Sequence, residues 1–228
     1  PKFGESVFLR YVLAAQDGVI SLSHHTSKQL SSTKEIPCLT HPHPINKGLA
    51  PIIEKEKARS ILGLNNNAPV VLFFGLIRKY KGVGLLIEAT AKLKNQIPDL
   101  RVLIVGEPYI PMAPYLKQSK ELGLEEIISF HTSYVEDKDV GVWFSACDCV
   151  VQPYQAASQS GITPMALHYQ RPMVATDVGG LSEGLDMPIA KIVSPYGSSI
   201  AAGLETILKA DSPSKKDFVV HQEQRSWK

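Results

Sequence analysis

VVLFFGLIRKYKGVGLLIEATAKL, residues 70–93, is the stretch of this sequence that decides the fold. Its first five residues form a continuous apolar run, which is typical of a strand buried on both faces of a parallel sheet. A glycine and a basic loop follow, and residues 82–93 then place apolar side chains at helical spacing. The stretch therefore predicts a strand, a loop and a helix that packs back on the sheet.

The same succession recurs along the chain. Further short apolar runs predict strands at residues 101–105, 127–131, 148–152, 172–176 and 190–193. The segments between and after them are interpreted as amphipathic helices at residues 115–122, 137–146, 161–169, 179–185 and 198–210. Parallel strands with helical crossovers of one hand favour an α/β fold, a Rossmann-like, doubly wound parallel sheet.

The first part of the chain does not follow this repeat. Its local patterns predict a helix at 5–16, a buried strand at 17–23, the start of a helix at 24–32, an extended linker with three prolines at 37–44 and a helix at 54–64. We interpret residues 1–45 as the tail of a preceding α/β domain with its linker, and residues 46–228 as the domain that is present in full. Since the chain begins with Pro1 and ends in what resembles a shortened helix, we expect it to be part of a longer protein.

Composition excludes several classes of protein. The 24 basic and 22 acidic residues give a net charge of +2, which predicts no general attraction to nucleic acid. No apolar run approaches the length of a membrane span and no signal-peptide pattern opens the chain. The three cysteines, Cys38, Cys147 and Cys149, are an odd and sparse set, which indicates reduced structural thiols in a cytoplasmic protein. The histidines lack metal-site spacing, and no metal site is predicted.

Ligands of an open parallel sheet bind beyond the carboxyl ends of its strands. Glycines recur in those loops, where they allow close approach of the backbone to a ligand or simply form turns: Gly75, Gly106, Gly161, Gly179 and Gly180. Neither a P-loop nor a dinucleotide-binding glycine fingerprint is present. A simple NAD enzyme and a P-loop ATPase are therefore disfavoured.

The run SQSG, residues 158–161, lies between a predicted strand and a predicted helix. Unpaired N–H groups and the helix dipole at such a start favour an anion such as a diphosphate, with Ser160 as the N-cap. Across from it, Arg78, Lys79 and Lys81 could neutralise the diphosphate charge. An ordinary helix cap and a solvated charged loop are the alternatives at these two places.

Four segments together resemble a known family: VVLFFGLIRKYKGVGLLIEA, VLIVGEPY, ISFHTSYVEDKDVGVWFSACDCVVQPY and QSGITPMALHYQRPMVATDVGGLSE. In this order they resemble the C-terminal half of the group 1 glycosyltransferases of family 4, over roughly residues 50–210. The resemblance implies a GT-B fold, in which two Rossmann-like domains enclose the active site and the C-terminal one binds the nucleotide-sugar donor. It also implies transfer with retention of configuration and no metal or other cofactor.

The resemblance implies a role for individual residues. Lys81 would contact the donor diphosphate. The arginine that the family carries directly after the strand-end glycine is absent, since Leu76 stands there, and we infer that Arg78 replaces it. The implied binding residues are Gly75, Gly106 beside the nucleotide, Tyr134 and Val135 at the base, the amides of Gln159, Ser160, Gly161, Ile162 and Thr163 at the phosphates, and Glu183, which matches the glutamate of a GG-x-x-E segment.

One departure from the family concerns the donor sugar and ribose. Many members carry two glutamates in an E-x7-E pattern, and those positions fall on Ala157 and Met165 here. The chain either uses the amides and hydroxyls of the SQSG run instead, which we favour, or has lost donor handling.

The resemblance thus implies a retaining glycosyltransferase of polysaccharide biosynthesis, which moves a sugar from a nucleotide-diphosphate sugar to a saccharide or lipid-linked acceptor, with peripheral membrane contact by the full-length protein. We expect this chain alone to bind donor weakly and to transfer little, because it supplies one wall of the cleft. The alternative is a non-catalytic nucleotide-binding or interaction module of GT-B type. An epimerase or phosphorylase of that fold is disfavoured, since no catalytic carboxylate and histidine set or cofactor lysine is apparent.

Overall fold

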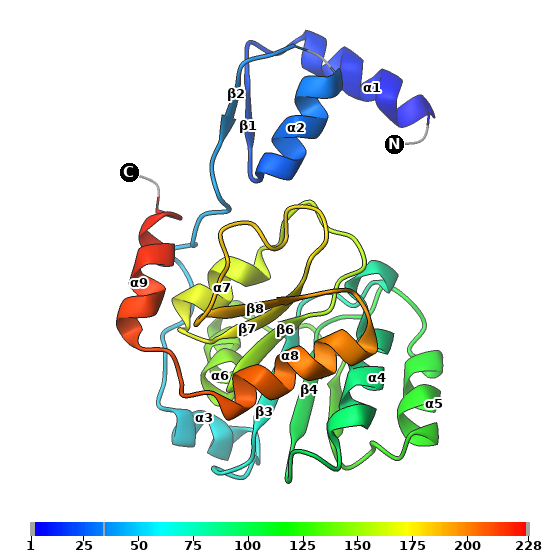
Figure 1. Cartoon of the computed structure of the whole chain (residues 1–228), viewed down its shortest axis with the longest axis vertical. Helices are drawn as coiled ribbons and strands as arrows, with labels where there is room; N and C mark the ends of the chain where they lie inside the picture. Colours follow the sequence, from blue (N-terminus) through cyan, green and yellow to red (C-terminus); the bar gives the residue numbers. More distant parts are fainter. Residues whose placement is uncertain (1–2, 34, 227–228) are drawn as a thin grey trace.

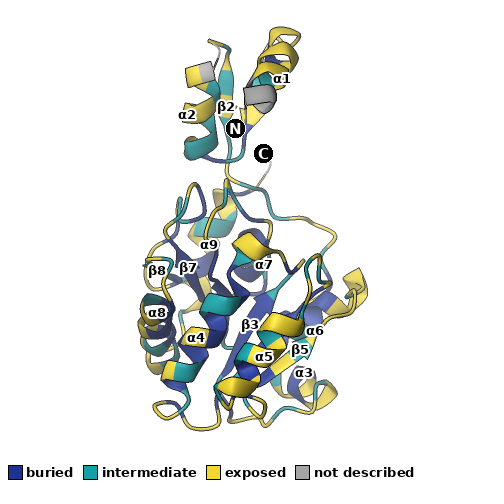
Figure 2. Cartoon of the chain, turned by 90° about the vertical axis from the view of Figure 1, so that its right-hand side faces the viewer, coloured by how far each residue is buried: buried dark blue, intermediate teal, exposed yellow. Residues whose placement is uncertain are grey.

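The computed structural model describes residues 3–33 and 35–226 and shows a small unit above a larger α/β body (Figure 1). We call the described part of residues 1–45 the tail and residues 46–226 the body. The tail consists of α1 (Phe3–Ala14), β1 (Val19–Ser21), α2 (His24–Thr33) and β2 (Cys38–Thr40). Figure 2 shows that most of the tail is exposed or half-buried.

The tail differs from the sequence prediction in two ways. Cys38–Thr40, predicted as part of an extended linker, forms a strand that pairs in parallel with β1. The strand predicted as buried is short, and Ile20 within it is 59% exposed because nothing in the described chain packs on that face. The interpretation of this unit as the end of another domain stays a prediction.

The body is built on one parallel sheet. Its strands are β3 (Val70–Phe74), β4 (Arg101–Val105), β5 (Ile128–His131), β6 (Cys149–Gln152), β7 (Met173–Thr176) and β8 (Ala190–Val193). They are ordered β5-β4-β3-β6-β7-β8, so the strand order reverses between β3 and β6. All six predicted strands are present and the predicted α/β, doubly wound parallel fold is confirmed.

Helices cover both faces of this sheet. They are α3 (Lys55–Ile61), α4 (Val83–Leu93), α5 (Ala113–Glu121), α6 (Val140–Ala146), α7 (Ile162–His168), α8 (Gly197–Lys209) and α9 (Lys215–Glu223), with short 3-10 turns η1 (Lys79–Lys81) and η2 (Asp137–Asp139). Helices α4, α5 and α8 lie on one face, and α3 and α6 on the other (Figures 1 and 2).

Residues 179–185, predicted as a helix, form turns instead. Gly179 and Gly184 have φ angles of +56° and +66°, in the left-handed region that ends a right-handed helix. The prediction was wrong because the apolar spacing of this segment comes from Leu181 and Leu185, which are buried without being helical. The turns keep this loop beside the tail.

Burial of the strands supplies the core. Val70, Val71 and Leu72 are fully buried on β3, and the neighbouring strands are buried in the same way because helices cover both faces. Cys147 and Cys149 are free, buried thiols within this core, and burial raises the pKa of both, that of Cys147 to about 12. Both therefore stay neutral thiols that pack as small apolar groups.

Residues 3–33 and 35–226 contain no helix with the length and apolar character that a membrane span requires.

Candidate functional site

The loops after β3 and β6 pack directly on each other where the strand order reverses. A Cβ atom on Gly82 would lie 1.8 Å from the carbonyl oxygen of Pro153, and its φ angle is +71°, so only glycine fits there. The amide of Gln155 donates to the carbonyl of Tyr80 at 2.7 Å. The two loops therefore form one continuous surface at the place where open sheets bind ligands.

Lys81 lies at the centre of this surface. Its Nζ is 5.4 Å from the ring centroid of Tyr154. A Cβ atom on Gly75 would lie 3.2 Å from Lys81 Nζ and 3.3 Å from Ile162 Cδ1, so these three predicted residues converge. Burial, and then the charge of Arg78, lower the pKa of Lys81 to about 8. Within the described residues no carboxylate forms an ion pair with Lys81, which leaves its charge available to an anion.

Gly106 closes the neighbouring strand end. A Cβ atom there would lie 2.2 Å from the carbonyl oxygen of Gly75, so the two predicted glycines are in contact. The exposed Arg78 stacks on Tyr109, with its Cζ 4.9 Å from the ring centroid, and its carbonyl accepts the amide of Lys81. The loop after β3 thus carries three cations, of which Lys79 is exposed like Arg78, and glycines directly follow β3 and β4.

Ser160 and Thr163 are buried and bonded within the site. The Ser160 hydroxyl accepts the amide of Ile162 at 3.2 Å and lies 3.4 Å from the Tyr154 hydroxyl, while Thr163 donates to Gln152 Oε1 at 3.2 Å. The N-cap of α7 is Gly161, so the prediction that Ser160 is the N-cap was wrong by one position. The amide of Ile162 is therefore occupied by Ser160. Burial raises the pKa of Tyr154 to about 12, so its phenol stays neutral.

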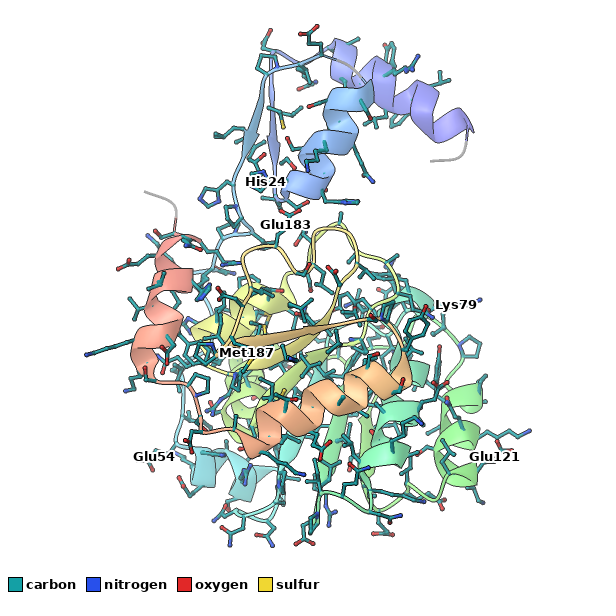
Figure 3. All side chains as sticks on the ribbon, viewed as in Figure 1. His24, Glu54, Lys79, Glu121, Glu183 and Met187 are labelled. Atoms are coloured by element: carbon teal, nitrogen blue, oxygen red, sulfur yellow. The ribbon has the colours of Figure 1, made fainter. Side chains whose placement is uncertain are left out.

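A cavity of about 140 Å³ lies between the tail and the body. Gln159, Ser160 and Thr163 line it together with Glu183 and the buried Arg225. The carboxylate of Glu183 accepts the backbone amides of His24 at 2.6 Å and His25 at 2.7 Å (Figure 3). The structure thus brings Glu183 to the first residues of α2.

Tyr134 and Val135 lie in a separate cavity of about 540 Å³ at the end of β5. It shares no lining residue with the cavity that holds Ser160. Its aromatic lining includes His131 and Trp143, whose ring centroids are 4.7 Å apart. The Tyr134 side chain is 69% exposed, so it can turn toward a planar ligand at little cost in buried area.

Four residues that contact or line the candidate site were not predicted from the sequence: Gln152, Tyr154, Tyr109 and Arg225. Gln152 ends β6 and Tyr154 follows two residues later, so the rule that strand ends face the ligand could have found both. Tyr109 follows β4 in the same way, whereas no sequence pattern marks Arg225. Within the described residues, no group of three or more His, Cys, Asp or Glu side chains could hold a metal ion.

The chain is similar in sequence to known proteins. Residues 68–210 match the family model described as Glycosyl transferases group 1. The lipopolysaccharide core biosynthesis mannosyltransferase LpsB of Rhizobium meliloti is 30% identical over 180 residues, which is 76% of this chain and 49% of that protein. A D-inositol 3-phosphate glycosyltransferase of Corynebacterium aurimucosum is 30% identical over 182 residues, which is 75% of this chain and 43% of that protein. The chain therefore spans less than half of the length of these relatives.

Solved structures share the fold at lower identity. Sucrose-phosphate synthase from Thermosynechococcus elongatus superposes with a TM-score of 0.82 and 22% identity, over 97% of this chain and 56% of that one. HepE from Anabaena, solved in complex with UDP, superposes with a TM-score of 0.79 and 20% identity, over 99% of this chain and 63% of that one. These similarities extend over the tail as well as the body.

Proposed function

The chain belongs to the group 1 glycosyltransferases, and on that premise we propose that it carries the donor-binding domain of a retaining enzyme. This enzyme moves a sugar from a nucleoside diphosphate sugar to an acceptor hydroxyl. The observation that carries the proposal is the convergence of Lys81, Gly75 and Ile162 where the strand order reverses. Because the chain spans less than half of its curated relatives, the reaction of the whole protein is part of the proposal.

Charge complementarity favours a diphosphate at the place where Lys81, Gly75 and Ile162 converge. Lys81 is partly desolvated and has no carboxylate partner in the described chain, so an incoming diphosphate would restore the lost solvation of its ammonium. Arg78 adds a second charge from the same loop. Gly106 lets the loop after β4 pack directly on Gly75, and Gly75 lets Lys81 and Ile162 approach the end of β3. The amides of Gln159 and Gly161 would supply further donors.

The same groups explain how transfer would be accelerated. The bond between the anomeric carbon and the phosphate oxygen breaks, and the departing diphosphate gains negative charge. Lys81 and Arg78 stabilise that charge more strongly in the transition state than in the bound donor. The acceptor hydroxyl attacks from the face that the diphosphate leaves, and its proton departs with the diphosphate, so configuration is retained.

The choice of nucleotide is assigned to the cavity at β5, where Tyr134 and Val135 would hold the base. The names of similar proteins mention two different nucleotides. A mannosyltransferase of Xanthomonas campestris uses GDP-mannose, as its name states, and HepE was solved with UDP. We propose a saccharide or lipid-linked acceptor, in keeping with the glycolipid and lipopolysaccharide named for these relatives.

A second candidate is a nucleotide-binding module of GT-B type without transfer activity. It is favoured by Ala157 and Met165, which stand where many members of the family carry glutamates. Such a module would bind a nucleoside diphosphate and its sugar derivatives with equal affinity. A donor site would instead distinguish one nucleotide sugar from others with the same base.

Calorimetric titration with UDP, GDP and ADP tests the proposal. We expect one diphosphate to bind best, and Lys81→Ala to weaken it at least about tenfold, as the loss of a charge-assisted contact does. Arg78→Ala should weaken binding less, because its side chain is exposed. Lys92→Ala, which removes an exposed charge on α4, is the matched control and should bind as the wild type does. If none of the three diphosphates binds, the donor-site proposal fails for this chain.

A further inference from the structure

We propose that the segment Gly179–Glu183, which follows β7, couples the position of the tail to the loop that carries Gln159 and Ser160. In this proposal Glu183 is a positioning residue and does not touch the donor. The effect on ligand binding rests on the proposed function, whereas the coupling itself is a property of the fold.

Glu183 holds the tail. Its two carboxylate oxygens accept the amides of His24 and His25, which lie 159 and 158 residues earlier in the sequence. These amides belong to the first turn of α2, where backbone N–H groups lack helical partners and the dipole favours a negative charge. The carboxylate therefore caps a helix of the tail from a loop of the body, as Figure 3 shows at the junction of the two units.

Gly180 lies between the tail and the loop that carries Gln159 and Ser160, which we call the ligand-side loop. A Cβ atom there would lie 2.6 Å from Ser23 Cβ and 2.3 Å from the carbonyl oxygen of Ser158. Its amide donates to the carbonyl of Ala157 at 3.2 Å. The segment thus contacts Ser23 of the tail and two residues of the loop before Gln159, with no space for a larger side chain.

Arg225 supports the segment from the C-terminal side. Its side chain is 4% exposed, and Nη2 donates to the carbonyl of Glu183 while Nη1 donates to that of His221, both at 3.3 Å. The carbonyl of Arg225 in turn accepts the amide of Ile45, at the end of the predicted linker. The segment is therefore tied to α9 and to the chain that leaves the tail.

These contacts link the position of the tail to the position of the ligand-side loop, and a two-domain enzyme has to coordinate the two. If the tail moves away, it must either break its bonds to Glu183 or draw the segment with it. Movement of the segment acts on Ala157 and Ser158 through Gly180, and these residues directly precede Gln159 and Ser160. A direct contact between Glu183 and a diphosphate is disfavoured, because both oxygens are engaged and like charges repel.

Residue-resolved amide exchange by NMR on the whole chain tests the coupling. Glu183→Ala should raise exchange at His24 and His25 by about tenfold, the effect of losing a helix cap. It should also raise exchange at Gly180, whose acceptor belongs to the ligand-side loop. Glu183→Gln keeps one acceptor oxygen and should give an intermediate result, which guards against misfolding of the alanine variant.

Ser182→Ala is the matched control. The Ser182 hydroxyl donates to the carboxylate of Asp177 at 2.8 Å, whereas the tail amides donate to Glu183, so its loss should leave His24 and His25 unchanged. The amide of Arg101, which donates to the carbonyl of Pro69 at the start of β4, serves as an internal reference that no variant should alter. Faster exchange at His24 and His25 with no change at Gly180 would overturn the coupling and leave Glu183 as a helix cap alone.

Titration of the same variants with the preferred nucleoside diphosphate adds the functional readout. We expect Glu183→Ala to weaken binding several-fold, with Glu183→Gln in between and Ser182→Ala unchanged. Weaker binding without any change in exchange at His24 and His25 would overturn the proposal, since Glu183 would then contact the ligand. If the wild type binds no diphosphate, the proposed function fails, and the exchange experiment still decides the coupling.

Discussion

The ammonium of Lys81 lies 5.4 Å from the ring centroid of Tyr154, and the hydroxyl of Tyr154 lies 3.4 Å from that of Ser160. One buried phenol thus joins the cation on the β3 loop to the start of α7. Because the ring face is electron-rich, it holds the ammonium in place without neutralising it as a carboxylate would. The charge of Lys81 stays available to a ligand for this reason.

Diphosphate affinity should fall as the pH rises from 7 to 9. Burial and Arg78 lower the pKa of Lys81 from 10.5 to about 8, so the free protein loses the positive charge across this range. The bound form favours the charged ammonium, and binding near pH 8 should therefore take up about half a proton. Calorimetry in buffers of different ionisation enthalpy measures this uptake.

Lys81→Arg is the control for this pH effect. Arginine keeps its charge throughout the range, so its affinity should stay flat between pH 7 and 9. The phosphates of the ligand are already ionised there and contribute little slope. An equal fall in affinity for Lys81→Ala would show that another group titrates, and would contradict the assignment.

Gly106→Ala should destabilise the chain and abolish diphosphate binding. The new Cβ would lie 2.2 Å from the Gly75 carbonyl oxygen, and φ is +142°, so we expect a loss of about 2–4 kcal/mol in the free energy of unfolding. Gly63→Ala separates the steric contact from the backbone strain. Gly63 has a φ of +66° and a Cβ there would meet open space, so this variant should lose only about 1 kcal/mol in the free energy of unfolding. Urea unfolding followed by circular dichroism measures both. Equal losses would show that contact with Gly75 is unimportant.

The sheet could be predicted because its strands are buried on both faces. Such strands are continuous apolar runs, and each of the six runs forms a strand within one residue of the predicted ends. The second tail strand was missed because Cys38–Thr40 is a three-residue strand beside prolines. Only its pairing with Val19–Ser21 makes it a strand, and that partner is distant in sequence.

The candidate site was predictable where it depends on strand ends. Gly75 and Lys81 follow β3 directly, so the rule for open sheets places them at the ligand edge. The partner of Glu183 could not be predicted, because spacing within residues 179–185 carries no information about amides in the tail. The contacts of Tyr154 with Lys81 and Ser160 could not be predicted either, because they depend on how two loops pack on each other.

Trp143 should report whether the base occupies the cavity at β5. Its indole lines that cavity with Tyr134 and Val135, and it contacts the ring of His131 in a tilted arrangement. The chain has two tryptophans, and the second, Trp227, lies outside the described residues, so Trp227→Phe isolates the signal. In this variant the preferred nucleoside diphosphate should change Trp143 fluorescence.

Inorganic pyrophosphate distinguishes the base from the phosphates. It offers the anion for Lys81 but has no base, so it should compete for binding without changing Trp143 fluorescence. Tyr134→Ala should reduce the fluorescence change while leaving pyrophosphate binding intact. A fluorescence change with pyrophosphate, or none with any nucleotide that calorimetry shows to bind, would place the base elsewhere.

Asp148→Asn should destabilise the body by about 3 kcal/mol, the usual result of removing one partner of a buried ion pair. The carboxylate of Asp148 pairs with Lys55 and with Arg59, at 2.7 Å for the latter, and it also accepts the amide of Val70. The Arg59 side chain is 2% exposed, so its charge would be left without a counter-charge. Urea unfolding followed by circular dichroism measures the loss.

Glu121→Gln is the matched control for Asp148→Asn, because it removes one exposed partner of the pair with Lys117. That pair spans 3.7 Å between side chains that are mostly exposed, and its loss should cost less than about 0.5 kcal/mol. In the double variant Arg59→Met with Asp148→Asn, no unpaired guanidinium remains beside position 148, so the loss should be smaller than the sum of the two single losses. Additive losses would mean that Asp148 acts through Val70 and Lys55, and that Arg59 is stabilised by its backbone acceptors alone.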